Sequence, residues 1–162
     1  MFRIDQKDCD DKAELYSDLE SQARSLLSGE CDPVANAANL ASLIFHLLPD
    51  LNWVGFYFLR DGDLLVGPFQ GKPACVRIGM GRGVCGTAAS EQRTMLVDDV
   101  GTFPGHIPCD MDSRSEAVVP LVAADGSLLG VLDLDSPTQG RFDEIDARGL
   151  EALAGVYVDS LV

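Results

Sequence analysis

One run of aromatic and β-branched residues constrains the fold of this chain more than any other feature of its sequence. Residues 53–59 read WVGFYFL, and the dipeptide Asp61-Gly62 that follows them is typical of a two-residue hairpin turn. Residues 63–69 then resume an apolar pattern. Because a hairpin joins antiparallel neighbours, this part of the chain is predicted to begin an antiparallel sheet rather than a parallel one.

Helical periodicity is confined to the two ends of the chain. Apolar residues recur at helical spacing within residues 10–48, across a break at SGECDP, and again at about 143–160. A second hairpin is predicted between strands at 116–122 and 127–134. Helices before and after hairpin-connected strands are typical of an α+β fold, with a central antiparallel sheet and helices mainly on one face. We expect one domain of this kind, its sheet and loops lying within residues 51–136.

Charge and the N-terminal sequence exclude several classes of function. The formal net charge is −14, whereas nucleic acids and anionic membrane surfaces bind proteins that carry a basic patch. No stretch reaches the roughly 18 apolar residues of a membrane span, and no signal peptide is recognisable. We therefore expect a cytoplasmic protein that binds neither nucleic acid nor a membrane. The sequence leaves the oligomeric state open, a homodimer being one alternative.

Three cysteines lie among glycines, prolines and polar residues, where packing alone does not call for a cysteine. They are Cys75, Cys85 and Cys109. A reactive thiol needs solvent access and nearby positive charge, which basic residues such as Lys72 supply here. His106, three residues before Cys109, is either a base for that thiol or a structural residue. With no CxxC or HxxxH motif a metal site is not expected, and the pattern favours thiol redox chemistry.

A glycine-rich stretch, GMGRGVCG, surrounds Cys85. It lacks the GK[ST] ending of a phosphate-binding loop, and no βαβ unit follows it. The glycines are instead expected to let the backbone turn tightly, with a short helix beginning just after Cys85. The dipole at the N-terminus of such a helix would stabilise a thiolate at this position.

Acidic and aromatic side chains are predicted to share one face of the sheet. In LDLDS, Asp133 and Asp135 alternate with leucines, so both carboxylates point to the same side. Trp53 and Tyr57 likewise share one side of their strand, and Glu116 stands at the entrance of a third strand. Such a face either meets solvent or lines a pocket for a small cationic or zwitterionic ligand. The pattern alone leaves these two alternatives open.

Several segments of the chain carry a resemblance to a known family. In order they are GPFQGKPACVRIGMGRGVCGTAA, GHIPCD, SEAVVPLV and GVLDLDS, preceded by the aromatic strand NWVGFY. Together they closely resemble the free methionine-R-sulfoxide reductases, which are single GAF domains. The likeness runs from about residue 52 to the end, and the three cysteines fall at the family's spacing. It implies a single GAF domain over residues 1–162 and favours the pocket over the solvent face.

The resemblance implies a reaction: the reduction of free L-methionine (R)-S-oxide to L-methionine. Cys109 would attack the sulfoxide sulfur and become a sulfenic acid. Cys85 would resolve that acid as an intramolecular disulfide, with Cys75 as a second resolving thiol. A thioredoxin-type dithiol would then restore the reduced protein by exchange. No metal or organic cofactor is implied.

The same resemblance implies roles for the polar and aromatic residues. Glu116, Asp133 and Asp135 would share proton donation and recognition of the substrate's ammonium group, while Trp53 and Tyr57 would enclose its methyl-sulfoxide end. Two alternatives stay open, a non-catalytic GAF sensor of small molecules and a peroxide-sensing thiol protein. A sensor does not need three matched cysteines, and a peroxide sensor does not need the acidic and aromatic pocket.

Overall fold

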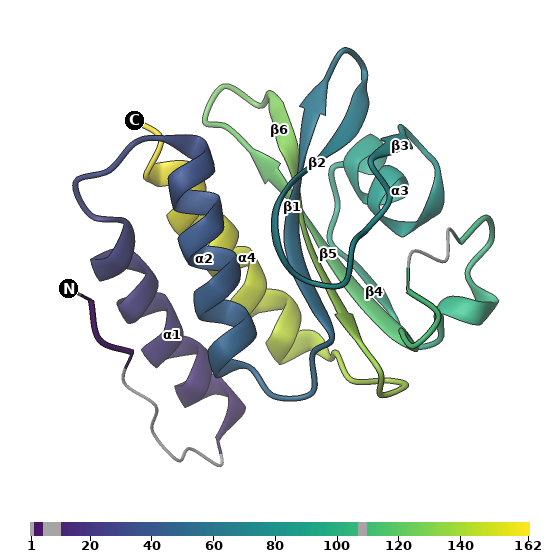
Figure 1. Ribbon diagram of the computed structural model, residues 1–162, viewed down its shortest axis with the longest axis horizontal. Coiled ribbons are helices and arrows are strands. Elements are labelled where there is room, and N and C mark those ends of the chain that lie inside the picture. The colour runs from purple at the N-terminus through teal and green to yellow at the C-terminus, as the bar shows by residue number, and fades with distance from the viewer. Residues whose placement is uncertain (1, 5–10, 107–109) are drawn as a thin grey trace.

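The computed structural model describes residues 2–4, 11–106 and 110–162 (Figure 1). Cys109, the predicted nucleophile, lies outside the described residues, and so does Cys9. Within the described residues, no helix is both long and apolar enough to span a bilayer.

A six-stranded antiparallel sheet forms the centre of the molecule (Figure 1). Its strands run in the order β3-β2-β1-β6-β5-β4, so the chain's two hairpins lie side by side in the sheet. The strand bounds are Trp53–Arg60 for β1, Asp63–Gly71 for β2, Arg77–Gly79 for β3, Met95–Val97 for β4, Ser115–Val122 for β5 and Leu128–Ser136 for β6.

The first hairpin has the turn that its sequence predicts. Asp61 has a φ of 53° and Gly62 a φ of 86°. Positive φ at both central residues is the geometry whose twist matches that of the flanking strands. Arg60 and Asp63 are therefore paired directly across the turn. The second predicted hairpin, between β5 and β6, is confirmed as well.

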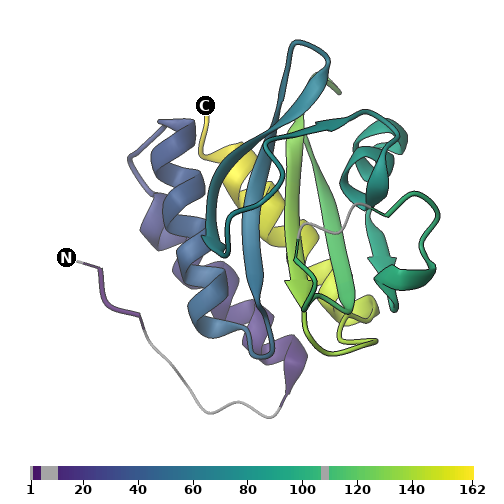
Figure 2. The ribbon, with the colours of Figure 1, turned by 45° about the vertical axis from the view of Figure 1, so that its right-hand side comes forward.

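Three helices lie on one side of the sheet, two of them against the strands and the first on the outer side of those two, and a short fourth helix lies on the other face (Figures 1 and 2). The covering helices are α1 (Lys12–Leu27), α2 (Pro33–Leu47) and α4 (Glu144–Asp159), and the short one is α3 (Gly83–Glu91). A 3-10 turn spans Val100–Thr102. The predicted α+β arrangement, with an antiparallel sheet and helices mainly on one face, is thus confirmed.

Aspartates set the beginnings of the covering helices. The side chain of Asp32 accepts hydrogen bonds from the backbone N–H groups of residues 34 and 35, and Pro33 takes the first helical position. Asp143 forms a capping box with Asp146 at the start of α4. The predicted start of α3 is wrong: the helix begins at Gly83, two residues before Cys85, so this thiol lies in the first turn.

The two faces of the sheet carry separate hydrophobic clusters. Phe56, Leu132 and Leu134 point toward α2 and α4 and form the main core with their buried residues. Because side chains alternate along a strand, the residues between them face α3. The second cluster there includes Trp53, Tyr57, Val84, Cys85, Val118 and Val131. The large core stabilises the fold, which leaves the smaller cluster's face available for a site.

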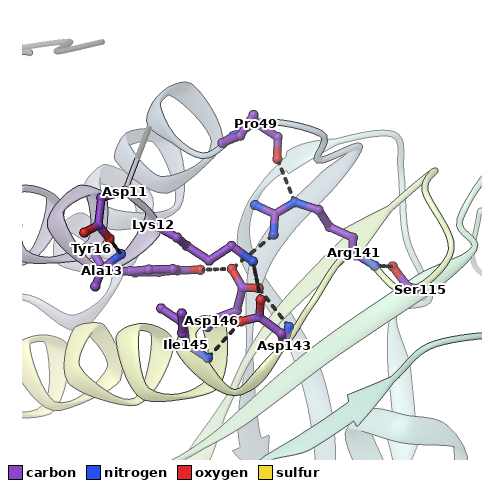
Figure 3. A network of polar contacts seen from close by, with 10 residues as sticks. All are labelled: Asp11, Lys12, Ala13, Tyr16, Pro49, Ser115, Arg141, Asp143, Ile145 and Asp146. Carbon is purple, nitrogen blue, oxygen red and sulfur yellow. Dashed lines mark hydrogen bonds and ion pairs between the residues drawn. The ribbon is translucent and has the colours of Figure 1, made fainter. Parts of the chain in front are cut away.

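A buried carboxylate joins the first helix to the last (Figure 3). Asp146 is fully buried. Its oxygens accept hydrogen bonds from Tyr16 Oη at 2.8 Å, Arg141 Nη1 at 3.0 Å and Lys12 Nζ at 2.7 Å. The backbone N–H of Asp143 donates to it at 2.8 Å. The charge of Asp146 is therefore paired and hydrogen-bonded, as a buried charge must be.

Removal of this carboxylate should destabilise the whole domain. In Asp146→Ala the cations of Lys12 and Arg141 and the hydroxyl of Tyr16 lose their buried partner, a change that typically costs about 3–5 kcal/mol. We expect a loss of this size in the free energy of unfolding, measured by urea denaturation. Glu20→Gln, which removes the partner of Arg24 in a surface pair, should change it by less than about 1 kcal/mol. Equal effects of the two substitutions would contradict the role of Asp146.

Candidate active site

A pocket opens on the α3 side of the sheet. It brings together all five residues predicted to bind a ligand and one of the three predicted catalytic cysteines. Its lining includes Trp53, Tyr57, Lys72, Arg82, Cys85, His106, Asp110, Ser113, Glu116, Asp133 and Asp135. The acidic and aromatic face of the sheet therefore lines a pocket and does not simply meet solvent, which were the two alternatives that the strand pattern left open.

The sheet register explains why these side chains meet. In β1 and β6, Trp53 is paired with Asp135 and Gly55 with Asp133, and in β5 and β6, Glu116 is paired with Asp135. Directly opposed residues of antiparallel strands point to the same face of the sheet. One row of the sheet thus places an aromatic ring and two carboxyl groups side by side, with Asp133 in the next row.

Gly55 allows the aromatic wall of the pocket to form. The Trp53 ring packs across it, because a Cβ atom at position 55 would lie 2.4 Å from both Trp53 Cη2 and Phe69 Cβ. The Trp53 ring stacks on Phe69 with 5.2 Å between centroids and on Tyr57 with 5.9 Å. Phe69 was not predicted as part of the site, and its only sequence signal is its place opposite Gly55 in the hairpin.

The two aromatic residues of the pocket also hold the loop that carries Cys75. Trp53 Nε1 donates a hydrogen bond to the carbonyl oxygen of Lys72 at 3.1 Å, and Tyr57 Oη donates to that of Cys75 at 3.0 Å. Cys75 is disulfide-bonded, whereas Cys31 and Cys85 have free thiols. The disulfide of Cys75 therefore involves neither of these two cysteines, and its loop is fixed against the substrate-facing wall.

Cys85 and two carboxyl groups form a buried cluster at the base of the pocket. Cys85 is 3% exposed, and Glu116 and Asp133 are each 6% exposed. Cys85 Sγ lies 3.8 Å from Glu116 Oε1, and one ligand atom from each residue lies within 4.8 Å of the others. Oδ1 of Asp133 has no hydrogen-bond partner among the described residues. His106 reaches the same cluster, with Nδ1 3.9 Å from Glu116 Oε2.

Burial makes these groups hold their protons tightly. Burial and then the nearby charges of Asp133 and Asp135 raise the pKa of Glu116 well above its usual value. Burial raises the pKa of Asp133 to about 7. The pKa of Asp135 is also raised well above its usual value, first by burial and then by the nearby charge of Asp133. A carboxyl group that stays protonated near neutral pH is suited to donate a proton to a ligand. The pocket therefore offers acid catalysis as well as charge recognition.

The predicted stabilisation of a thiolate at Cys85 is wrong. Burial, followed by the nearby carboxyl groups of Asp133 and Glu116, raises the pKa of the Cys85 thiol well above its usual value. The short helix α3 does place Cys85 in its first turn. Its dipole is outweighed because three acidic groups share the same enclosed space.

A set of polar contacts ties together the two segments at the mouth of the pocket. Lys72 Nζ, from the loop after β2, pairs with Asp110 Oδ1 at 3.2 Å and with Asp112 Oδ2 at 2.5 Å. Asn52 Nδ2 donates to Asp110 Oδ2 at 3.3 Å and to Ser113 Oγ at 3.1 Å. Of these residues sequence reasoning singled out only Lys72, as a source of positive charge. Polar residues of irregular segments carry no periodicity that would have revealed their pairing.

Comparison with known proteins places the same architecture in a described family. Residues 34–161 match the GAF domain family. The chain is 49% identical to the free methionine-R-sulfoxide reductase of Escherichia coli strain K12, over 88% of this chain and 86% of that protein. It is 44% identical to the free methionine-R-sulfoxide reductase of Saccharomyces cerevisiae, over 93% of this chain and 88% of that protein.

A solved structure extends the likeness to three dimensions. The free methionine-R-sulfoxide reductase from Neisseria meningitidis, determined in complex with its substrate, is 42% identical and superimposes with a TM-score of 0.94. The match covers 99% of this chain and 96% of that one.

A methyl group at position 55 should displace the aromatic wall. In Gly55→Ala the new Cβ would clash with Trp53 and Phe69, so the Trp53 ring would have to leave its stacked position. Overpacking of this kind costs about 1–3 kcal/mol in the free energy of unfolding. Trp53 is the single tryptophan of the chain, so its fluorescence emission should shift to longer wavelength as the ring becomes exposed.

The matched control is Gly155→Ala in α4, where an added Cβ would meet nothing within 4 Å. Alanine has the higher helix propensity by about 1 kcal/mol, so this variant should be at least as stable as the wild type, with unchanged emission. An unshifted emission maximum in Gly55→Ala would show that the wall does not depend on this glycine.

Proposed function

The chain belongs to the GAF domain family, and on that premise we propose that it reduces free methionine (R)-sulfoxide to methionine. One observation carries the proposal: a single pocket combines buried carboxyl groups with a wall of stacked aromatic rings and lies beside two of the predicted catalytic cysteines. Relatives that bear the name of this activity cover most of the chain.

The proposed substrate fits the two ends of the pocket. Its ammonium group would donate to Asp133 Oδ1, which has no other partner in the described part of the chain. Glu116 and Asp135 lie close enough to share that charge, because they are paired with each other in the row of the sheet next to that of Asp133. The methyl group and sulfur of the substrate would lie against Trp53 and Tyr57, whose rings provide apolar surface.

The proposed reaction transfers one oxygen atom from the substrate to a cysteine. The thiolate of Cys109 attacks the sulfoxide sulfur, and Glu116 or one of the aspartates protonates the sulfoxide oxygen. The oxygen then moves to the sulfur of Cys109 as the substrate's sulfur–oxygen bond and the transient bond between the two sulfur atoms break. The cysteine is oxidised to a sulfenic acid and the sulfoxide is reduced to methionine. A second cysteine thiolate then attacks the sulfenic sulfur and forms a disulfide, and the sulfenic oxygen leaves as water.

We propose Cys75 as the first resolving thiol and Cys85 as the second, the reverse of the order that the family resemblance implied. The disulfide bond at Cys75 supports this order. So does the environment of Cys85, because a thiol whose pKa is raised by burial is a weak nucleophile at neutral pH. A thioredoxin-type dithiol would reduce the disulfide by exchange, which suits the reducing conditions of the cytoplasm.

Serine variants of the three cysteines test these roles. Without reductant, Cys109→Ser should form no methionine, because no sulfenic acid arises. Cys75→Ser should form about one methionine per protein and then turn over only slowly with thioredoxin, since the weakly nucleophilic Cys85 alone remains to form an exchangeable disulfide. Cys85→Ser should keep most of its thioredoxin-driven turnover. Methionine is measured by amino-acid analysis in single-turnover and steady-state assays.

Cys31→Ser serves as the control, because this exposed thiol lies away from the pocket. It should behave as the wild type in both assays. Loss of recycling in Cys85→Ser but not in Cys75→Ser would reverse the proposed order of the resolving thiols. Methionine formation by Cys109→Ser would refute the assignment of the nucleophile, and no reduction by the wild type would favour a sensor function.

Substrates without a free ammonium group should be poor. N-acetylmethionine sulfoxide presents a neutral amide, so the buried carboxyl groups lose their partner, at a cost of several kcal/mol. This corresponds to a decrease in kcat/KM of about a thousandfold. The ratio of kcat/KM for the free and the acetylated substrate measures it, and in Asp133→Asn the ratio should fall at least tenfold. Similar kcat/KM values for both substrates with the wild type would contradict ammonium recognition by these groups.

A further inference from the structure

Cys85 has a distinctive environment that the proposed reaction does not require. Among the described cysteines it is the buried one with a free thiol. The reaction as proposed needs a nucleophile and one resolving thiol, for which Cys109 and Cys75 suffice. What surrounds Cys85 is a cluster of oxygen atoms from Glu116 and Asp133, all enclosed at the base of the pocket. This combination of atoms is that of a ligand set for a metal ion.

The spacing of these atoms fits a tetrahedral cation. Zn²⁺ binds thiolate sulfur at about 2.3 Å and carboxylate oxygen at about 2.0–2.2 Å, so two such ligands lie roughly 3.6 Å apart. Cys85 Sγ is 3.8 Å from Glu116 Oε1. The largest separation among the three ligand atoms is within 4.8 Å, so about 1 Å of side-chain movement completes the geometry.

A further observation points to a ligand at this place. Asp133 is 6% exposed, yet its Oδ1 has no hydrogen-bond partner in the described part of the chain, which leaves a buried acceptor unsatisfied in the cluster. His106 Nδ1 lies 3.9 Å from Glu116 Oε2 but outside the group of mutually close ligand atoms, so the fourth position of a tetrahedral ion is left to a water molecule.

We propose that Cys85, Glu116 and Asp133 form an inhibitory site for a thiophilic divalent cation such as Zn²⁺ or Cd²⁺. A thiolate ligand selects these ions, whereas Mg²⁺ and Ca²⁺ prefer sets of oxygen atoms. The thiol proton of Cys85 passes to solvent when the metal binds. Metal binding is not a step of the proposed catalytic cycle, although its ligands take part in that cycle, and the occupancy of the site can be measured without any turnover.

The cation and the proposed substrate exclude each other. Both use the carboxyl groups of Glu116 and Asp133, and a metal ion held there occupies the place of the substrate's ammonium group. Inhibition by Zn²⁺ is therefore expected to be competitive with methionine sulfoxide and to be reversed by a chelator. It links the activity to the level of free zinc, which rises when other thiol proteins are oxidised and release the metal.

The two free thiols of the described chain provide a matched test. The protein with its Cys75 disulfide intact, freed of reductant, is titrated with Cd²⁺, whose bond to a thiolate gives a charge-transfer absorption in the ultraviolet. We expect one strong site in the wild type and in Cys31→Ser. Cys85→Ser should lose the absorption of that site and bind Cd²⁺ at least tenfold more weakly. Asp133→Asn, which keeps the Cys85 thiol, should also bind Cd²⁺ at least tenfold more weakly. Mg²⁺ at the same concentration should not compete.

Kinetics with Zn²⁺ provide a second readout. Alanine, which chelates zinc through the same amino and carboxylate groups as methionine sulfoxide, is added in equal concentration to correct for simple chelation. A rise in KM with kcat unchanged, absent in Cys85→Ser, is expected. Equal Cd²⁺ affinity in the wild type and Cys85→Ser, or a loss in Cys31→Ser instead, would overturn the proposal. If the wild type binds Cd²⁺ but does not reduce methionine sulfoxide, the proposed metal site is supported and only the proposed function is refuted.

Discussion

The pairing of β1 with β6 and of β6 with β5 is the constraint on which the rest of the structure depends. It places Trp53, Asp135 and Glu116 in one row and Gly55 with Asp133 in the next. A slip of one residue would turn the carboxyl groups into the hydrophobic core and the leucines between them into the pocket. The main core prevents that slip, because Leu132 and Leu134 are packed under α2 and α4.

Because of this register, one face of the sheet forms the hydrophobic core and the other face lines the pocket. The face under α1, α2 and α4 is apolar and stabilises the domain, and the Asp146 network joins the ends of the helical layer. The opposite face buries Glu116, Asp133 and Asp135, which by itself is unfavourable. Protonation lowers that cost, as their raised pKa values indicate. A zwitterionic ligand would lower it further, and so would a metal ion.

The aromatic wall of the pocket also holds the loop that carries Cys75. Trp53 and Tyr57 provide apolar surface with their rings, and their polar atoms hold the loop of Cys75 by its backbone. Lys72, in that loop, pairs with Asp110 and Asp112 across the mouth of the pocket. The aromatic wall and the loop of Cys75 are therefore held together by two hydrogen bonds.

Local patterns in the sequence determined the antiparallel sheet, the hairpin at Asp61-Gly62, the capped helices and the shared face of Asp133 and Asp135. Each of these depends on residues within a few positions of one another, where alternation, turn chemistry and capping act. Only the tertiary structure decided that the acidic face is enclosed, that Cys85 lies against Glu116, and that burial raises the pKa of the Cys85 thiol. These features arise from segments far apart in the chain, and the free energy of a buried charge depends on everything that surrounds it.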